Sequence, residues 1–174
     1  RLFAEGTFNA AFIPSYTAER IKSKKKGKKF ADDVLGIISI VLLFIVALAE
    51  IFTPFLVYLI APGFYDNLTK FNLAVELTRI TFPFLFFVSL SSFFSGILNS
   101  NNKFAAAAAA PIILNIILIF SLIASFLLKL NFATNLSYGV TFAGIIQLIF
   151  LIINTKKYYK PSFKLKIKIS SKLN

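Results

Sequence analysis

Glu50 combines an ionisable side chain with an unusual place in the sequence. It lies inside a long apolar run, and no basic residue lies within one helical turn of it. A carboxylate that faced lipid there would be strongly disfavoured, and it would take up a proton first. We therefore expect Glu50 to face a water-filled cavity, where it could act as a relay, or a partner on another helix. The alternative is that the helix boundary is shifted and Glu50 lies closer to the outer surface of the membrane.

Two pairs of opposite charges have spacings that place them on one face of a helix. Glu76 and Arg79 are three residues apart, and Arg1 and Glu5 are four apart. The simpler interpretation of the first pair is an ion pair within its helix. The functional interpretation leaves Arg79 partly able to meet an anion, so that both residues become candidates for a cavity or relay. Arg1 and Glu5 can also pair, and both could face a cavity.

Four residue types are absent from the chain, namely His, Cys, Met and Trp. Their absence removes the usual zinc ligands, the thiol nucleophile, disulfides and the imidazole base. We therefore expect no catalytic residue, no metal site and no cofactor, and we predict that the protein is not an enzyme. Because the chain has no Met and opens on Arg1 inside an organised segment, we expect it to be a piece of a longer protein.

Long apolar helices must position these charged residues. Hydrophobic residues make up 57% of the chain and charged residues 15%. A helix needs about 20 mostly apolar residues to cross about 30 Å of hydrocarbon. We predict an all-α, polytopic transmembrane helix bundle within residues 1–155, with about five membrane helices, of which the first is truncated. The expected helices span about residues 2–19, 33–60, 73–98, 104–128 and 134–154.

The basic residues are unevenly distributed between the loops that alternate along these helices. Of the 19 Lys and Arg residues, fifteen lie in Arg20–Lys29, in Asn99–Lys103 or in the tail from Lys156 to Lys172. The positive-inside rule makes this side cytoplasmic, so that Tyr65–Asn72 and Lys129–Ser137 face out. The basic loops are also suited to anionic lipid headgroups. Nucleic-acid binding is the minor interpretation, and we expect no nucleic-acid partner.

The tail, residues 156–174, is predicted to be a basic cytoplasmic linker. Its segment Phe163–Ile169 alternates apolar and basic residues, with a period of two that is typical of a strand. The alternative, which we prefer, is a linker on the membrane surface whose Lys side chains lie among the headgroups. An isolated strand beside lipid is disfavoured because it leaves its backbone unpaired.

Prolines interrupt several of the predicted helices. Pro14, Pro83 and Pro111 each remove a backbone hydrogen bond, and each tends to kink its helix. Kinked helices are common in transporters, where bending opens a cavity, but they also occur in rigid bundles. The run Ala105–Ala110 permits close contact between helices, and it also favours helix formation by itself.

Six short strings have the order and the spacing of one family's signatures. They are Arg1–Phe8 with Ala11–Pro14 (R-x-F-A-E-G-x-F and A-F-x-P), Ala61–Phe64 (A-P-G-F), Ile80–Pro83 (I-T-F-P), Gly96–Asn99 with Phe104, Ala110–Asn115 (A-P-x-x-x-N) and Gly144–Leu148 (G-x-x-Q-L). These strings resemble the MviN/MurJ lipid II flippases, and the match covers nearly the whole chain.

The resemblance implies a fold and a task. The family belongs to a large exporter superfamily built from two six-helix lobes, and this chain would supply the second to sixth helices of the first lobe and the start of the inter-lobe linker. The family moves lipid II, the undecaprenyl-pyrophosphate-linked peptidoglycan precursor, across the bacterial cytoplasmic (inner) membrane by alternating access for cell-wall synthesis. The implied partners are this precursor, membrane lipids and the remainder of its own chain.

The resemblance also implies roles for particular residues. Arg1 matches the second member of a basic pair that the family places in its cavity, which implies that Arg1 binds the substrate pyrophosphate. Arg suits this task because it stays charged and offers a planar fork of donors. Glu5 matches the acidic position of A-E-G, and it is implied to help organise the Arg cluster. Glu50 has no counterpart, so its role rests on its place in the sequence alone.

Other functions compete with a lipid flippase. Another exporter of the same superfamily would move a different lipid-linked oligosaccharide or a drug, but a cationic drug favours acidic rather than basic cavity residues. A non-transporting membrane scaffold would bind partners through the basic tail, yet it has no need of Glu50, Arg1 or interior prolines. A membrane enzyme is the weakest candidate, because the sequence shows no nucleophile–base set.

Overall fold

Every regular element in the described part of the chain is helical. The computed structural model describes residues 2–162, and side chains from residue 7 onward, so the predicted alternation at Phe163–Ile169 lies outside the described residues. The elements are α1 (Leu2–Lys22), α2 (Lys24–Ile51), α3 (Thr53–Ile60), the 3-10 turn η1 (Pro62–Phe64), α4 (Leu68–Thr81), α5 (Phe84–Asn99), α6 (Phe104–Leu128) and α7 (Phe132–Thr155). The prediction of an all-α helix bundle is confirmed.

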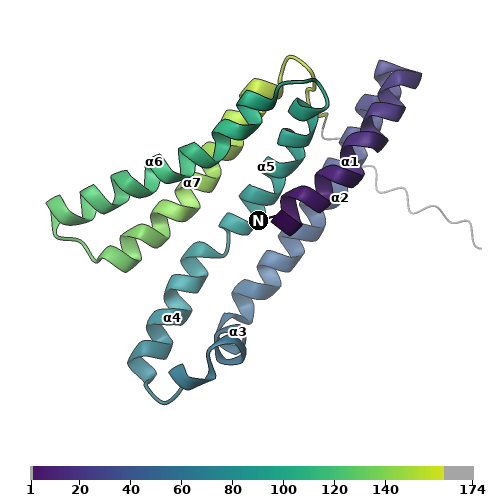
Figure 1. Ribbon diagram of the computed structural model, residues 1–174. Coiled ribbons are helices and arrows are strands. Elements are labelled where there is room, and N and C mark those ends of the chain that lie inside the picture. The colour runs from purple at the N-terminus through teal and green to yellow at the C-terminus, as the bar shows by residue number, and fades with distance from the viewer. Residues whose placement is uncertain (1, 163–174) are drawn as a thin grey trace, which may run out of the picture.

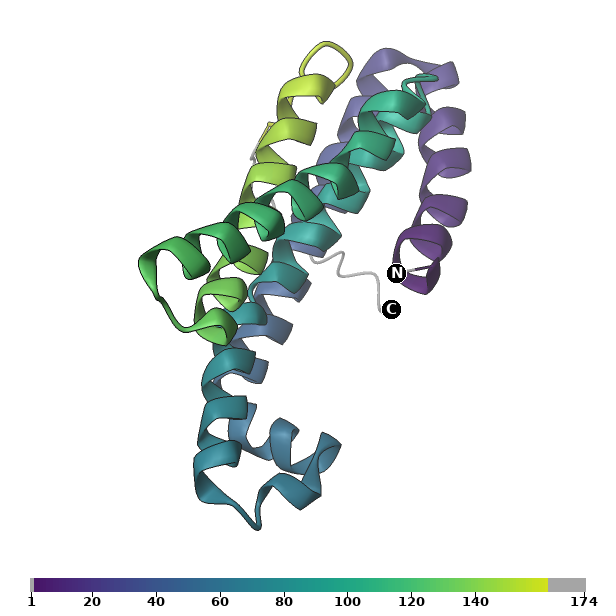
Figure 2. The ribbon, with the colours of Figure 1, turned by 60° about the vertical axis from the view of Figure 1, so that its left-hand side comes forward.

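Helix α5 is the central element of the bundle. It contacts α1 and α2 on one side and α6 and α7 on the other (Figures 1 and 2). Its side chains Phe93 and Ile97 are fully buried, and they pack in one apolar core with Phe12 of α1, Leu35 of α2 and Leu151 of α7. Because this core joins four helices, it fixes how each helix is rotated relative to α5.

Four stretches of the described chain are long and apolar enough to cross a membrane: α2, the α4–α5 segment, α6 and α7. The outward faces of α2 and α6 are apolar and carry exposed large side chains, such as Phe44 and Phe120. An exposed apolar surface of this extent is unusual for a soluble protein, whereas lipid tails are as apolar as these side chains. These faces therefore suit contact with lipid, as expected of a multi-pass membrane protein.

The second predicted helix, residues 33–60, needs correction at its start and near its end. It begins already at Lys24 and is divided between Ile51 and Thr53. Pro54 has no N–H to donate to the carbonyl oxygen of Glu50. The Thr53 hydroxyl donates to that oxygen instead, at 3.0 Å. The break is therefore possible inside an apolar span, because a side chain supplies the hydrogen bond that proline removes.

The third predicted helix, residues 73–98, is also divided. Helix α4 begins at Leu68, and Phe82 and Pro83 separate it from α5. Beside this break, the hydroxyl of Thr141 in α7 donates a hydrogen bond to the carbonyl oxygen of Ile80. A polar contact between helices therefore accompanies the interruption.

The other predicted kink prolines do not divide their helices. Pro14 lies inside α1, and Pro111 lies inside α6. Helix α6 occupies the range predicted for it, whereas α7 begins at Phe132 instead of residue 134. It does so because the Asn131 side chain caps it by accepting a hydrogen bond from Thr134 N at 3.1 Å.

The segment predicted as a basic loop, Arg20–Lys29, is a helical hairpin. Helix α1 extends to Lys22 and α2 begins at Lys24, so that Ser23 is the single break. Ser23 Oγ accepts a hydrogen bond from Lys26 N at 3.1 Å and thereby caps α2. Lysine is also a good helix former, so the charge run that indicated a loop supports helix instead.

Candidate functional site

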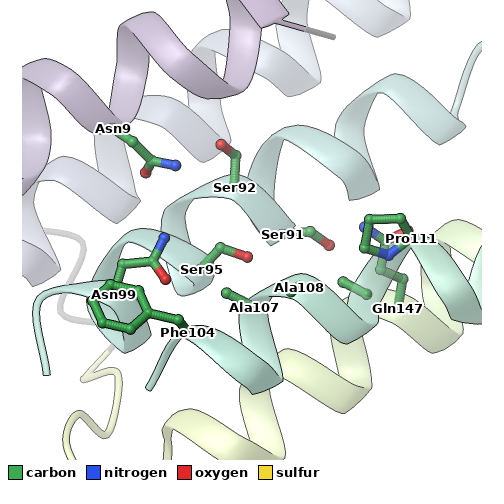
Figure 3. A pocket seen from close by; sticks show the side chains of 11 residues that line it. Asn9, Ser91, Ser92, Ser95, Asn99, Phe104, Ala107, Ala108, Pro111 and Gln147 are labelled. Carbon is green, nitrogen blue, oxygen red and sulfur yellow. The ribbon is translucent and has the colours of Figure 1, made fainter. Parts of the chain in front are cut away.

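A pocket of about 280 Å³ lies between α1, α5 and α6, and α7 contributes one residue to it (Figure 3). The polar side chains that line it are Asn9, Ser91, Ser92, Ser95, Asn99 and Gln147. The remaining wall consists of Phe104, Ala107, Ala108, Ala110 and Pro111. None of the described residues that line it carries a charge, so their chemistry is that of neutral groups that donate and accept hydrogen bonds.

Four polar atoms of this pocket are buried and have no hydrogen-bond partner among the described side chains and backbone: Asn9 Oδ1, Ser91 Oγ, Ser92 Oγ and Gln147 Oε1. Ser91, Ser92 and Gln147 are only 2%, 8% and 3% exposed. A buried polar group that stays unpaired costs about 1–3 kcal/mol. The pocket therefore favours water or a bound group that can hydrogen-bond.

Helix α5 places most of these polar groups on one face. Ser91 or Ser92, Ser95 and Asn99 follow one another at spacings of three or four residues, which keeps them on the same side of the helix. On its other sides, Phe93, Phe94 and Ile97 are buried in the apolar core. The packing of that core therefore turns the serines toward the pocket.

Helix α6 forms the facing wall with small residues. Alanine side chains leave room for the pocket, and Pro111 lies at its deeper part. Because Pro111 has no N–H, the carbonyl oxygen of Ala107 loses its usual helical donor. Both residues line the pocket, so this wall also holds a backbone acceptor without its helical partner.

Asn9 reaches the pocket where α1 and α5 approach closely. A Cβ atom at Gly96 would lie 2.7 Å from Asn9 Oδ1 and 3.0 Å from Phe12 Cδ1. A larger residue at this position would force one of these side chains to move. Gly96 therefore allows the contact that brings Asn9 opposite the serines of α5.

The two predicted substrate-binding residues are not described at the level of side chains. Arg1 lies outside the described residues, and Glu5 lies in α1 without a described side chain. The roles of both residues therefore stay predictions from the sequence.

Glu50 lies apart from this pocket, in the last turn of α2. One of its carboxylate oxygens is buried without a hydrogen-bond partner, and the positive charge of Arg79 on α4 is close enough to attract it. Glu76 and Arg79 are both exposed. The predicted ion pair between them is not formed, because the only salt bridge among the described side chains joins Lys22 and Glu19.

A second polar cluster ties the segment after α7 to the start of α2. Asp32 accepts hydrogen bonds from the Tyr159 hydroxyl at 2.6 Å, from Ser162 N at 3.1 Å and from the Ser162 hydroxyl. Burial and the hydrogen bond to Asp32 raise the pKa of the Tyr159 hydroxyl. Tyr159 therefore stays protonated near neutral pH and continues to donate to a residue far away in sequence.

The pocket was not predicted from the sequence, because the predicted site residues were only charged residues and helix prolines. Asn9, Ser91, Ser92 and Gln147 are uncharged, yet polar groups inside apolar spans also need partners. A signal was present, since the serines recur at helical spacing within a phenylalanine-rich run. Pro111 was predicted as a kink, and it lines this pocket.

The chain is similar to a set of named membrane proteins. The family model described as Lipid II flippase MurJ matches residues 1–173. The chain is 45% identical over 158 residues to a probable lipid II flippase MurJ of Rickettsia prowazekii, covering 90% of the chain and 31% of that protein. It is 42% identical over 161 residues to that of Rhizobium tropici, covering 90% and 30%, and 32% identical over 160 residues to that of Treponema pallidum, covering 88% and 29%. The chain thus spans about 30% of the length of these curated relatives.

Proposed function

We propose, because this chain belongs to the lipid II flippase MurJ family, that it takes part in moving the lipid-linked peptidoglycan precursor across the bacterial cytoplasmic membrane. The observation that carries the proposal is the family match over residues 1–173. The names of the relatives describe lipid transport and not catalysis, so we propose a transporter without a catalytic residue. Other exporters and a membrane scaffold are not favoured by these names.

The helix arrangement supports a mechanism of alternating access. The headgroup of the precursor carries charges and polar groups, which lipid tails cannot solvate. The bundle offers buried polar atoms inside apolar helices, in the pocket described above. The breaks at Phe52 and at Phe82–Pro83 divide two spans into shorter segments, and helix ends of this kind can absorb the rotations that such a cycle needs.

We assign separate roles to the two groups of predicted site residues. Arg1 and Glu5 are proposed to bind the pyrophosphate and to organise its site, because their sequence positions match the family signature. Glu50, Glu76 and Arg79 lie toward the α3–α4 end, and they stay candidates for a cavity or relay there. Anionic lipids are proposed partners of the basic hairpin Arg20–Lys29.

The experiment is complementation of a bacterium depleted of its own lipid II flippase, with the complete gene product that contains this chain. We expect the wild-type protein to restore growth and the appearance of precursor in the outer leaflet. Arg1→Ala should lower precursor movement about 10- to 100-fold, because a hydrogen-bonded charge pair contributes about 1.5–3 kcal/mol. Arg1→Lys should restore only part of it, since lysine lacks the bidentate fork.

Lys157→Ala is the matched control, because Lys157 is an exposed basic residue outside the basic hairpin and outside the proposed site. It should support growth like the wild type. A wild-type protein that reaches the membrane but restores no precursor movement would refute the proposed function. Normal movement with Arg1→Ala at matched expression would remove Arg1 from the binding site and leave the function standing.

A further inference from the structure

We propose that the pocket between α1, α5 and α6 binds an uncharged sugar ring that bears hydroxyl and amide groups, and neither a phosphate nor a metal cation. The inference rests on the proposed function, because the ring would belong to the glycan of the lipid-linked precursor. It adds a second, neutral recognition site to the charged one proposed at Arg1.

The chemistry of the wall selects a neutral ligand. Serine hydroxyls and the carboxamides of Asn and Gln both donate and accept hydrogen bonds, as do the hydroxyl and amide groups of a sugar. Phosphate groups are usually bound by Arg or Lys side chains, and divalent cations are usually bound by carboxylates. Neither kind of residue occurs among the lining residues that the structure describes.

The polar groups converge from three helices onto one space. Asn9 reaches it from α1, Ser91 and Ser92 from α5, and Gln147 from α7, and Figure 3 shows these side chains around the pocket. Each has a buried oxygen that finds no partner in the part of the chain that the structure describes. Groups on separate, packed helices are held at fixed distances, so they favour a rigid ring with several hydroxyls over a flexible chain.

The size and the depth of the pocket fit one ring. Its volume is about 280 Å³, at the lower end of the range for small-molecule sites. Phe104 is exposed at one end of the pocket and offers an aromatic face to the apolar side of a sugar. From Phe104 to Pro111 the pocket follows α6 for about 10 Å, at about 1.5 Å per residue. It therefore begins beside the Asn99–Lys103 turn, on the side predicted to be cytoplasmic.

The first test measures access to the pocket. Because this chain has no cysteine, Ser92→Cys can be introduced into the complete gene product after any cysteine elsewhere is replaced. In nanodiscs, a small charged thiol reagent should label it, and free N-acetylglucosamine at saturating concentration should slow the labelling about fivefold or more. Sodium pyrophosphate and exchange of sodium for potassium should leave the rate unchanged. Ala47→Cys, which is exposed on the lipid-facing helix α2, is the unreactive control.

The second test measures transport by the complete gene product. Gln147→Leu should lower precursor movement about five- to tenfold, as expected when one buried hydrogen bond to the ligand is lost. Asn154→Leu is the matched control, because Asn154 lies two turns later on α7 and is no part of the pocket. If Gln147→Leu fails to fold, the milder pair Ser91→Ala and Ser92→Ala replaces it, with folding checked by size-exclusion profile.

The possible results separate this inference from the proposed function. An unreactive Ser92→Cys would show that the rest of the complete gene product covers the pocket. Labelling at a rate that the sugar leaves unchanged would show that the pocket holds water only. Either result overturns the inference. Protection by sodium or by pyrophosphate in place of the sugar also overturns it. If the pocket variants transport the precursor like the wild type, the sugar site is refuted and the proposed function is not affected. If the wild type itself transports nothing, the proposed function fails first.

Discussion

Glu50 and Arg79 lie on different helices, and their charges act on each other across the gap between α2 and α4. One oxygen of Glu50 is enclosed by protein, whereas the Arg79 side chain is exposed. No salt bridge joins these two described side chains. A charge interaction with an exposed partner contributes little, typically up to about 1 kcal/mol, because water and salt screen it. Its role is therefore to make an unfavourable carboxylate tolerable there, more than to stabilise the bundle.

A double-mutant cycle on these two residues tests this relation. Glu50→Gln should lower the free energy of unfolding by about 1 kcal/mol or less, and Glu50→Lys by more, because it places two positive charges near each other. Adding Arg79→Glu to Glu50→Lys should restore part of the loss. Unfolding in detergent, followed by circular dichroism, measures the wild type, Glu50→Lys, Arg79→Glu and their double variant, which form the cycle, and Glu50→Gln beside them. Strictly additive effects would show that Arg79 is not the partner of Glu50.

The sequence could predict that Glu50 needs protein or water beside it, because the cost of a carboxylate in lipid does not depend on the fold. It could not identify Arg79 as the residue whose charge acts on it. Spacing along one helix favoured a pair of Arg79 with Glu76, since contacts within a helix are the only ones that a single sequence makes visible. The place of α4 relative to the end of α2 depends on the break at Phe52 and on the packing of α3 against α4, which spacing along one helix does not show.

At the scale of helices, the apolar spans were predictable, and Pro83 correctly indicated one interruption, whereas Pro14 and Pro111 do not divide their helices. Length and hydrophobicity are properties of a whole apolar run, so a helix can be predicted even where its exact ends are wrong. A break depends on local hydrogen bonds, such as those made by Thr53 and Thr141. The pocket depends further on how α1, α5 and α6 are rotated, which the core contacts of Phe12, Phe93 and Ala110 decide. These residues are far apart in sequence, so no local pattern reveals them.

Gly144 gives a test of how closely α5 and α7 pack. A Cβ atom there would lie 2.7 Å from Phe84 Cδ2 and 3.1 Å from Phe87 Cβ. Gly144→Ala should therefore lower the free energy of unfolding by about 1–3 kcal/mol, as overpacking usually does. Gly36→Ala is the matched control, because a Cβ atom at Gly36 would have nothing within 4 Å of it; its higher helix propensity should stabilise α2 by up to about 1 kcal/mol. Equal effects of the two substitutions in detergent unfolding would contradict the close packing.

At the scale of the whole molecule, the structure separates two ends of the bundle. The α1–α2 connection, the α5–α6 turn and the end of α7 lie at one end, and the α3–α4 and α6–α7 connections lie at the other (Figure 1). The basic hairpin Arg20–Lys29 therefore shares an end with Lys103 and Lys156. The hydrogen bonds of Asp32 to Tyr159 and Ser162 hold the segment after α7 at this same end. The alternation of loops that the topology prediction assumed is thus present in the fold, whereas the side that faces the cytoplasm stays a prediction.

Cysteine labelling in intact cells tests that orientation. Lys26→Cys, in the basic hairpin, should react with an impermeant thiol reagent only after the membrane is permeabilised, whereas Tyr65→Cys, between η1 and α4, should react at once. Both residues are exposed, so burial does not bias the comparison, and the chain contains no other cysteine. Labelling of Lys26→Cys in intact cells would reverse the orientation. We expect the predicted one, because each positive charge moved outward against the membrane potential costs about 2.3 kcal/mol per 100 mV, and the hairpin carries seven Lys and Arg residues.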